Sequence, residues 1–263
     1  MKKKIMALFG LVLCALIRIV SAQDKNVALL NAYATLSDRI GRAEAALKRG
    51  GRGDLENCEK EALFCLGKLP EHHEAHLLMS QVFYKRGEYV PALEHVRAAE
   101  EGFLKLTEAM TVMEQKRMKE QADSVAGLID DVQDYTAADQ AAKSRGSCQP
   151  YRYSKDLEDA KNKLIKEGRW TDKDPSQAMT QVPAEYRFWH GNCLFRLKRL
   201  PEAEAEYLLA VKINPAYAEA YNNLINLLYI EKRLDEARSL LSQAEAHKAS
   251  IQPGLKKAVL EAR

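Results

Sequence analysis

Hydrophobic and small residues between Ala184 and Ala249 fall at helical spacing, and the same pattern returns at a constant interval along the chain. The equivalent positions are Asn192 and Asn226, Leu200 and Leu234, Ala203 and Ala237, Tyr207 and Leu241, and Ala210 and Ala244. Asn214-Pro215 separates the two segments. A proline ends a helix because it has no amide hydrogen and disfavours a helical residue before it. The pattern therefore predicts two units of two helices each.

A period of about 34 residues with two helices per unit is typical of the tetratricopeptide repeat, and both segments resemble that family. In family terms, Gly191 is the small residue of the first helix, and Pro215 closes the unit. Ala203 and Ala210 are the small residues of the second helix. Ile225 replaces the glycine in the second unit, which bears on how tightly that helix pair packs. The resemblance implies an all-α scaffold that binds another protein, and it names no partner.

Residues 24–106 carry a second block of repeats with the same period. The equivalent pairs are Gly53 and Gly87, Cys58 and Ala92, and Cys65 and Ala99. The first unit is expected to begin at Arg39 and to close at Pro70, and the second is expected to begin at His73. Both glycines are expected in the turn between the helices of their unit. Helical spacing before Arg39 predicts that its helix extends back to about Asp24.

The middle of the chain does not keep the period. Residues 105–143 contain no proline and a single glycine, which predicts one or two long helices. A break at 145–150, a return helix at 153–166 and a loop at 167–182 are expected to follow. The predicted organisation is therefore an α-solenoid in two blocks separated by a helical insertion. Its parts are a signal peptide (1–22), an N-terminal block (23–106), the insertion and linker (107–183), and a C-terminal block with a capping helix (184–263).

Residues 1–22 have the pattern of a secretory signal. Three lysines at 2–4 precede an apolar run, Ile5–Ile17, and small or acceptable residues at 20–22 offer a cleavage site before Gln23. Such a run is too short to span a bilayer comfortably. The sequence thus predicts an exported protein, periplasmic or secreted, with no membrane span after cleavage.

Two other uses of this segment are less favoured by its residues. A lipoprotein anchored at Cys14 would need a small residue just before the cysteine, and Leu13 stands there. A retained membrane anchor is disfavoured because Arg18 interrupts the apolar run.

Removal of the signal changes the charge of the chain. The full sequence has 40 basic and 37 acidic residues, a formal charge of +3. Four of the basic residues lie in the signal, so 36 remain against 37 acidic ones, a formal charge of −1. No broad positive field then remains to attract nucleic acid or anionic lipid. Nucleic acid is therefore not an expected partner.

Histidines gather at His72, His73, His76 and His95. His72 and His76 are four residues apart, a spacing that suits a metal site on a helix. The zinc-protease pattern needs a glutamate directly after the first histidine, and His73 stands there. His76 instead takes a position where the family places an aromatic residue in the helix packing. No metal or cofactor is therefore expected.

The cysteines predict packing rather than chemistry. Cys58 and Cys65 lie seven residues apart on one helix, about 10 Å along its axis, beyond the roughly 7 Å that a disulfide spans. These two and Cys193 occupy small-residue positions of the family pattern. Cys148 lies in a turn, where it either stays free or pairs with a second molecule. No histidine is placed to activate a cysteine, and no phosphate-binding loop or hydrolase motif occurs, so the chain is not expected to be an enzyme. The tripeptide Arg52-Gly53-Asp54 is attributed to chance, because the glycine has a role in the turn.

The family resemblance implies a peptide-binding groove lined by the first helix of each unit. Its positions in this chain are Leu77, Gln81, Tyr84, Lys85, Phe188, Asn192, Phe195, Asn222, Asn223, Asn226 and Tyr229. Asparagine is a mediocre helix former, so three in one short helix call for a reason. An asparagine amide can donate to and accept from the backbone of an extended peptide. The same side chains would also be present if they were only solvated, and both interpretations stay open. The family's clamp for a C-terminal carboxylate is incomplete, because Phe188 and Pro253 stand where lysines are expected, and Lys257 only partly compensates.

The sequence thus favours a non-enzymatic scaffold of the bacterial envelope that docks a peptide or helix of a partner protein in its groove. The alternative is a structural subunit that forms homo-oligomers through the insertion. A third, least favoured hypothesis is a solute- or metal-binding accessory protein that uses the histidine cluster.

Overall fold

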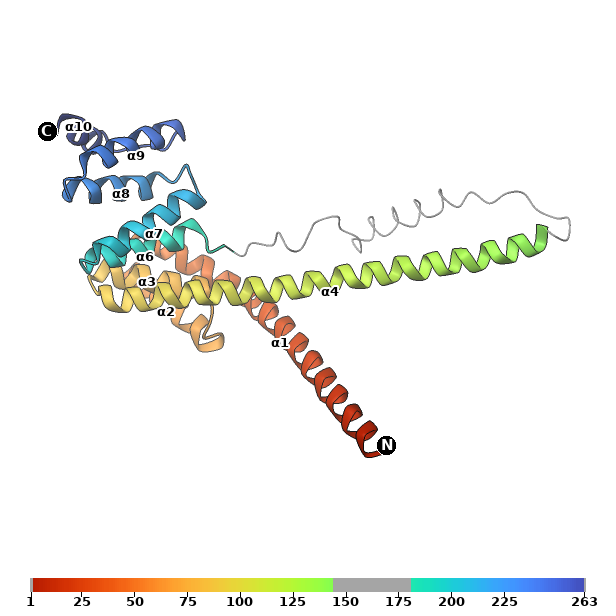
Figure 1. The fold of residues 1–263 in the computed structure, drawn as a ribbon. Helices are drawn as coiled ribbons and strands as arrows, with labels where there is room; N and C mark the ends of the chain where they lie inside the picture. Colours follow the sequence, from red (N-terminus) through yellow and green to blue (C-terminus); the bar gives the residue numbers. More distant parts are fainter. Residues whose placement is uncertain (1, 144–180, 263) are drawn as a thin grey trace. The chain divides into compact units, whose positions relative to one another are not determined.

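The computed structural model describes residues 2–143 and 181–262, and all regular structure in these two ranges is α-helical (Figure 1). The helices are α1 Lys2–Arg49, α2 Arg52–Lys68, α3 His73–Arg86, α4 Tyr89–Lys143, α6 Ala184–Arg196, α7 Leu200–Ile213, α8 Ala218–Ile230, α9 Leu234–Ala246 and α10 Pro253–Glu261. The predicted all-α class is confirmed. The contacts divide the chain into two compact units. One, here called the repeat body, holds residues 28–106 and 181–262, and the other contains residues 2–27 and 107–143.

The repeat body is a stack of helical hairpins. The C-terminal part of α1 packs on α2, and α3 packs on the first turns of α4. Helices α6 and α7 form the next hairpin, α8 and α9 form another, and α10 packs against both α8 and α9 (Figure 1). Each hairpin also contacts its neighbour through α2 and α3, α3 and α6, or α7 and α8. This is the architecture that the repeat period predicts.

Small residues lie where second helices approach their neighbours most closely. All eight predicted positions have an exposed fraction of 0%. They are Cys58, Cys65, Ala92, Ala99, Ala203, Ala210, Ala237 and Ala244. Cys193 is also fully buried, and the three described cysteines are free. Burial raises the pKa of the Cys58 and Cys193 thiols to about 11, so both stay protonated and act as small apolar residues.

The turns follow the predicted pattern with one correction. Gly87 ends α3 with φ at +84°, a conformation that side chains disfavour, and α10 begins at Pro253 as expected. Gly53, however, does not lie in a turn, because α2 already begins at Arg52. Gly50 makes that turn instead, with φ at +74° directly after α1. The prediction was wrong because two nearby glycines competed for one role.

The long helices extend beyond the repeats. Helix α4 runs for 55 residues without a break, and α1 forms one helix of 48 residues that includes most of the predicted signal. In the described part of the chain, no helix is long and apolar enough to span a membrane. The predicted break at 145–150, the return helix at 153–166, nearly all of the loop at 167–182 and Cys148 lie outside the described residues. The signal peptide itself stays a prediction.

The two predicted blocks of repeats are joined by one of two buried clusters, the other being formed by α1, α2 and α3. A single cluster of buried residues joins α3 and α4 to α6, α7, α8, α9 and α10. Phe103 of α4 lies against Tyr186 of α6, with ring centroids 5.9 Å apart. The hairpin α6–α7 therefore stacks on α3–α4 as the next unit of the array, although the whole insertion lies between Phe103 and Tyr186 in the sequence.

Candidate functional site

A cleft of about 670 Å³ opens on the first helices of three successive hairpins. It is called here the α1–α3–α6 cleft, although Phe103 of α4 and Pro183, just before α6, also border it. It is lined by Glu44, Leu47, Lys48, His73, Glu74, Leu77, Leu78, Gln81, Lys85, Phe103, Pro183, Glu185, Tyr186 and Trp189. Its volume falls in the range of ligand-binding clefts, and it is open enough to accept a chain segment.

Aromatic side chains form one wall of the cleft. The ring of His73 packs edge-on against Phe103, with centroids 5.4 Å apart, and its Nδ1 atom lies 2.5 Å from the Tyr186 hydroxyl. Burial lowers the pKa of His73 to about 4, so its imidazole is neutral at neutral pH. Burial also raises the pKa of Tyr186 far above its usual value, with nearby carboxylates adding to the shift. Both groups are thus neutral hydrogen-bonding surfaces within an apolar wall that Trp189 extends.

Charged groups border the cleft on the other sides. Glu44, Glu74 and Glu185 line it together with Lys48 and Lys85. Burial and, secondarily, the charge of Glu44 raise the pKa of Glu74. The Lys85 ammonium donates a hydrogen bond to the Leu47 carbonyl oxygen, at 3.1 Å, near the end of α1. Both signs of charge are therefore present, which gives a polar rim around an apolar floor.

A second, smaller hollow of about 120 Å³ lies on α6 and α8 and is called here the asparagine pocket. It is lined by Tyr84, Asn192, Phe195, Arg196, Tyr207, Asn223 and Asn226. The Oδ1 atom of Asn192 accepts hydrogen bonds from the Tyr207 hydroxyl, at 2.8 Å, and from the Asn223 amide, at 2.7 Å. Tyr84 meets Trp189 edge-on, with ring centroids 5.5 Å apart, so the side chains of the two hollows are in direct contact. The two adjacent hollows on the first helices are together called the groove here.

The predicted groove residues divide into three groups. Leu77, Gln81 and Lys85 line the larger cleft. Five others line the smaller hollow: Tyr84, Asn192, Phe195, Asn223 and Asn226. Phe188, Asn222 and Tyr229 border neither of these two hollows. The structure thus brings most of the predicted positions together, in two adjacent places.

Asn222 serves the fold at its C-terminal end. Its amide donates to the Ala218 carbonyl oxygen at 2.7 Å and to that of Ser250 at 3.0 Å, and its Oδ1 atom accepts from the Gln252 backbone at 2.8 Å. It is 9% exposed. Asn222 thereby holds the turn that precedes α10, which is a structural reason for one of the three asparagines.

Several lining residues lay outside the sequence prediction. Glu185, Trp189 and Arg196 lie on the same face of α6 as Asn192, at spacings of seven, three and four positions from it. That periodicity was readable from the sequence. Glu44 and Lys48 belong to α1, where the groove pattern was not extended to the first unit. Phe103 was not predictable, because it comes from a second helix.

The histidine cluster separates into two pairs. His76 and His95 face each other with their Nδ1 atoms 2.9 Å apart, and His76 Nε2 donates to the Pro70 carbonyl oxygen at 2.8 Å. His72 caps α3, where its Nδ1 atom accepts from the Ala75 amide. Burial lowers the pKa of His72 and His95 to about 4, so both rings are neutral. These histidines pack helices and do not converge on one point.

Comparisons with known proteins point to the same architecture. Residues 176–218 match the family model described as tetratricopeptide repeat. No curated protein matches the chain. The fold of the described residues is an array of helical hairpins of this type.

Solved structures of tetratricopeptide-repeat proteins are similar at low identity. A thermophilic one from Thermus thermophilus has 16% identity over 85% of this chain and 98% of its own, with a TM-score of 0.36. PilF of Pseudomonas aeruginosa has 15% identity over 82% of this chain and 78% of its own, with a TM-score of 0.33. YrrB, described as having an unusual peptide-binding site, has 15% identity over 89% of this chain and 97% of its own, with a TM-score of 0.28.

Proposed function

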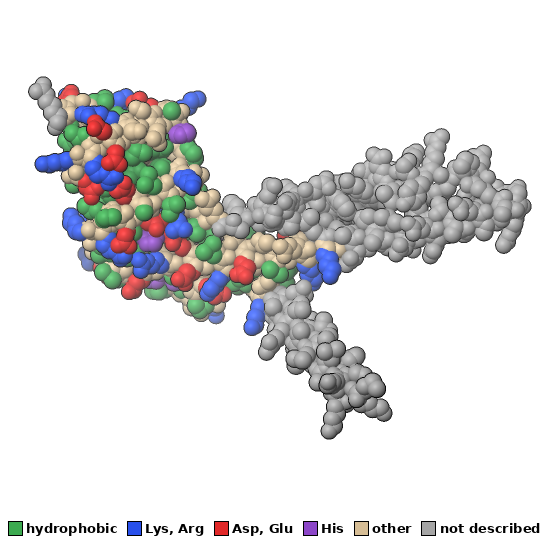
Figure 2. Space-filling model, in the orientation of Figure 1, with side chains coloured by type: hydrophobic (Ala, Val, Ile, Leu, Met, Phe, Trp, Pro, Cys, Tyr) green, Lys and Arg blue, Asp and Glu red, His purple; other side chains and the backbone are tan. Residues whose placement is uncertain are grey.

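We propose that this protein is an exported, non-enzymatic adaptor of the bacterial envelope that docks a peptide or helix of a partner protein in its groove. The observation that carries the proposal is the α1–α3–α6 cleft of about 670 Å³, with its aromatic wall and its mixed polar rim. A buried aromatic anchor surrounded by a polar rim is the usual anatomy of a peptide-recognition site. Basic and acidic side chains are interspersed over the described face seen in Figure 2, so the shape of the contact rather than a broad field would select the partner.

The asparagine pocket supplies the polar half of such recognition. Asn192 already accepts two hydrogen bonds, which fixes its amide plane. Among the described residues, its amide nitrogen has no hydrogen-bond partner, and the side chain lines the hollow. Such an amide can donate to a backbone carbonyl oxygen of a peptide without further ordering, because its orientation is set in advance.

Peptide binding is tested with a displayed library of random peptides and the immobilised protein. Selected peptides are synthesised, and their dissociation constants are measured by fluorescence anisotropy. Trp189→Ala is expected to weaken binding by at least about 30-fold, which corresponds to a hot spot of about 2 kcal/mol. Phe64→Ala is the matched control, since it removes an exposed aromatic of α2 that borders neither hollow. Equal affinity in the parent and Trp189→Ala would place peptide binding elsewhere.

Substitutions of two adjacent asparagines distinguish an effect on peptide binding from an effect on stability. Asn223→Ala is expected to weaken binding of the same peptides by about tenfold, the effect of one lost hydrogen bond to the ligand. Asn222→Ala is expected to lower stability and leave affinity unchanged, because Asn222 bonds only within the chain among the described residues. If Asn222→Ala weakened binding and Asn223→Ala did not, the proposed groove would be wrong.

Export is tested separately. The chain is expressed with its own N-terminus, and the mass of the product in the periplasm or medium is measured. The expected product begins at Gln23. An uncleaved chain in the cytoplasm would refute export and leave the groove untouched. If no peptide is selected and the protein sediments as an oligomer, the structural-subunit hypothesis is favoured instead.

A further inference from the structure

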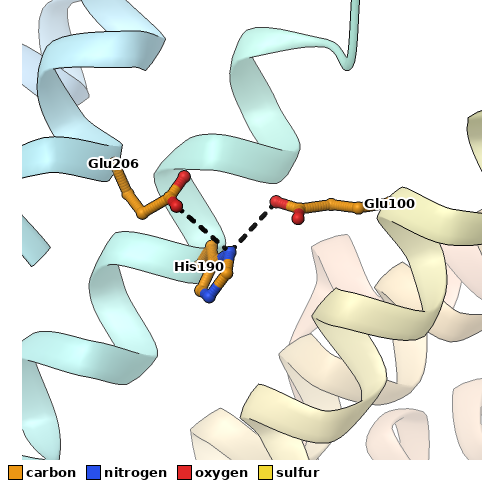
Figure 3. A group of neighbouring side chains, drawn as sticks. All are labelled: Glu100, His190 and Glu206. Atoms are coloured by element: carbon orange, nitrogen blue, oxygen red, sulfur yellow. Dashed lines mark hydrogen bonds and ion pairs between the residues drawn. The ribbon is translucent and has the colours of Figure 1, made fainter. Parts of the chain in front are cut away.

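Three potential metal ligands that line neither hollow meet between α4, α6 and α7. The imidazole of His190 lies between the carboxylates of Glu100 from α4 and Glu206 from α7 (Figure 3). Its Nδ1 atom is 3.1 Å from Glu100 Oε1 and 3.6 Å from Glu206 Oε1. One ligand atom from each residue lies within 4.8 Å of the other two. Three helices thus direct one nitrogen and two oxygens at a common point.

The cluster is shielded from solvent. The side chains of His190, Glu100 and Glu206 are 9%, 13% and 16% exposed. Neighbouring carboxylates on a protein surface are stabilised by solvent. Two carboxylates that are largely buried need positive charge nearby, because burying an uncompensated charge is costly. Arg187 supplies part of it, with its Nη1 atom 3.2 Å from Glu100 Oε1 and 3.2 Å from Glu206 Oε2. One guanidinium against two carboxylates leaves one negative charge.

We propose that Glu100, His190 and Glu206 bind a zinc ion, with Arg187 as an outer donor that holds the two carboxylates in place. Zinc bonds of about 2.0–2.1 Å in a tetrahedron separate neighbouring ligand atoms by about 3.3 Å. The two distances from His190 Nδ1, 3.1 and 3.6 Å, bracket that value. A set of one imidazole and two carboxylates suits zinc and leaves the fourth position for water.

Zinc takes the place of a proton in this geometry. A carboxylate oxygen only accepts, so the contact between Glu100 and Nδ1 requires a proton on that nitrogen. A metal needs the lone pair of Nδ1, and the proton must therefore leave that nitrogen when zinc binds. A doubly protonated ring releases it to solvent, whereas a neutral ring moves its proton to Nε2. Protons and zinc thus compete for the same atom.

A zinc ion at this site would link the two hairpins that the insertion separates in the sequence. Glu100 belongs to the last hairpin before the insertion, and His190 and Glu206 belong to the first hairpin after it. A metal bond across this interface would resist separation of α4 from α6 and α7. The site is independent of the groove, so peptide binding and zinc binding can fail separately.

The test is titration of the purified, metal-stripped protein with zinc chloride by isothermal titration calorimetry. The expected result is one zinc per chain and an increase in the unfolding temperature. His190→Ala is expected to lower zinc affinity at least about a hundredfold. Glu206→Gln keeps the shape of the side chain and is expected to lower zinc affinity as much. It serves as the test variant if His190→Ala folds poorly.

Two further variants make the test specific. Arg187→Gln is expected to bind zinc at least about tenfold more weakly, because the two carboxylates lose the outer donor that holds them in place. His95→Ala is the matched control and is expected to bind like the parent, since it removes contacts with His76 and Phe83 and none with the three proposed ligands. Absence of saturable binding by the parent would overturn the proposal. Parental affinity in His190→Ala, or loss of binding in His95→Ala, would place the metal elsewhere and overturn it as well.

Discussion

Gly191 lies directly beneath the ring of Tyr207, which explains why α6 has no side chain there. A Cβ atom added at Gly191 would lie 2.7 Å from Cε1 and 2.8 Å from Cδ1 of Tyr207, whereas ordinary contact begins at 3.4 Å. The ring would have to move by about 0.7 Å. Tyr207 is 1% exposed, and its hydroxyl donates to Asn192 at 2.8 Å, so it has little room to move. Gly191→Ala is therefore expected to destabilise the repeat body.

The expected change in the free energy of unfolding combines two losses and one gain. Overpacking of a buried side chain costs about 1–3 kcal/mol, and a strained or lost hydrogen bond costs about 1 kcal/mol more. Alanine in place of glycine within a helix recovers about 1 kcal/mol. The free energy of unfolding is expected to fall by about 2 kcal/mol. It is measured by urea unfolding, followed by tryptophan fluorescence and far-UV circular dichroism.

The next unit of the array suggests a second substitution that would relieve the clash caused by Gly191→Ala. At the equivalent positions, Ile225 replaces the glycine and Leu241 replaces the tyrosine, and both are buried. Tyr207→Leu alone is expected to cost about 2 kcal/mol, because it removes ring contacts and one hydrogen bond. The double variant is expected to be about 2 kcal/mol more stable than the sum of the single changes predicts. Additivity within about 0.5 kcal/mol, or a Gly191→Ala variant as stable as the parent, would refute the steric explanation.

Three other perturbations test the same body. The added Cβ of Gly102→Ala would overlap the Glu71 carbonyl oxygen in the α2–α3 turn. The free energy of unfolding, measured with urea, is therefore expected to fall by about 3 kcal/mol, and a fall below about 1 kcal/mol would contradict this. Asn222→Ala is expected to speed amide hydrogen exchange in α10 before any other helix, because it releases the preceding turn; uniform protection would contradict this. Burial lowers the pKa of His72 and His73 to about 4, below the roughly 6.5 of an unfolded histidine, so the unfolded chain takes up protons first as the pH falls. Stability is expected to be full above about pH 7.5 and to be about 2 kcal/mol lower per histidine at about pH 5, and a flat profile in urea unfolding would contradict it.

The local pattern of the sequence was enough to predict the helical hairpins. A constant repeat period and small residues at fixed positions identify where helices pack closely, and those eight positions are fully buried. These features are local because each helix forms from neighbouring residues and each turn from the few residues at its end, such as Gly87 after α3 and Lys198 after α6. The turn after α1 was placed wrongly, because Gly53 keeps the 34-residue spacing to Gly87 whereas Gly50 makes the turn.

The residues that line the two hollows were predicted in part. Eight of the eleven predicted positions line one of the two hollows, since the face of a helix follows from its period. The role of Asn222 was not visible, because its partners at Ser250 and Gln252 lie beyond the next helix and approach only when α10 packs. The wall formed by Phe103 and Tyr186 depends equally on packing across the insertion.

The sequence by itself determined that this chain is an array of helical hairpins, because the period of its small and apolar residues is a property of the chain. Only the tertiary structure decided that one buried cluster joins the two blocks of repeats and that Glu100, His190 and Glu206 meet. The insertion separates Glu100 from His190 in the sequence, and Glu206 follows on the next helix. No periodicity relates such positions. They meet because burial of the apolar faces of α4, α6 and α7 brings these helices together. The polar residues beside those faces are thereby brought close to one another.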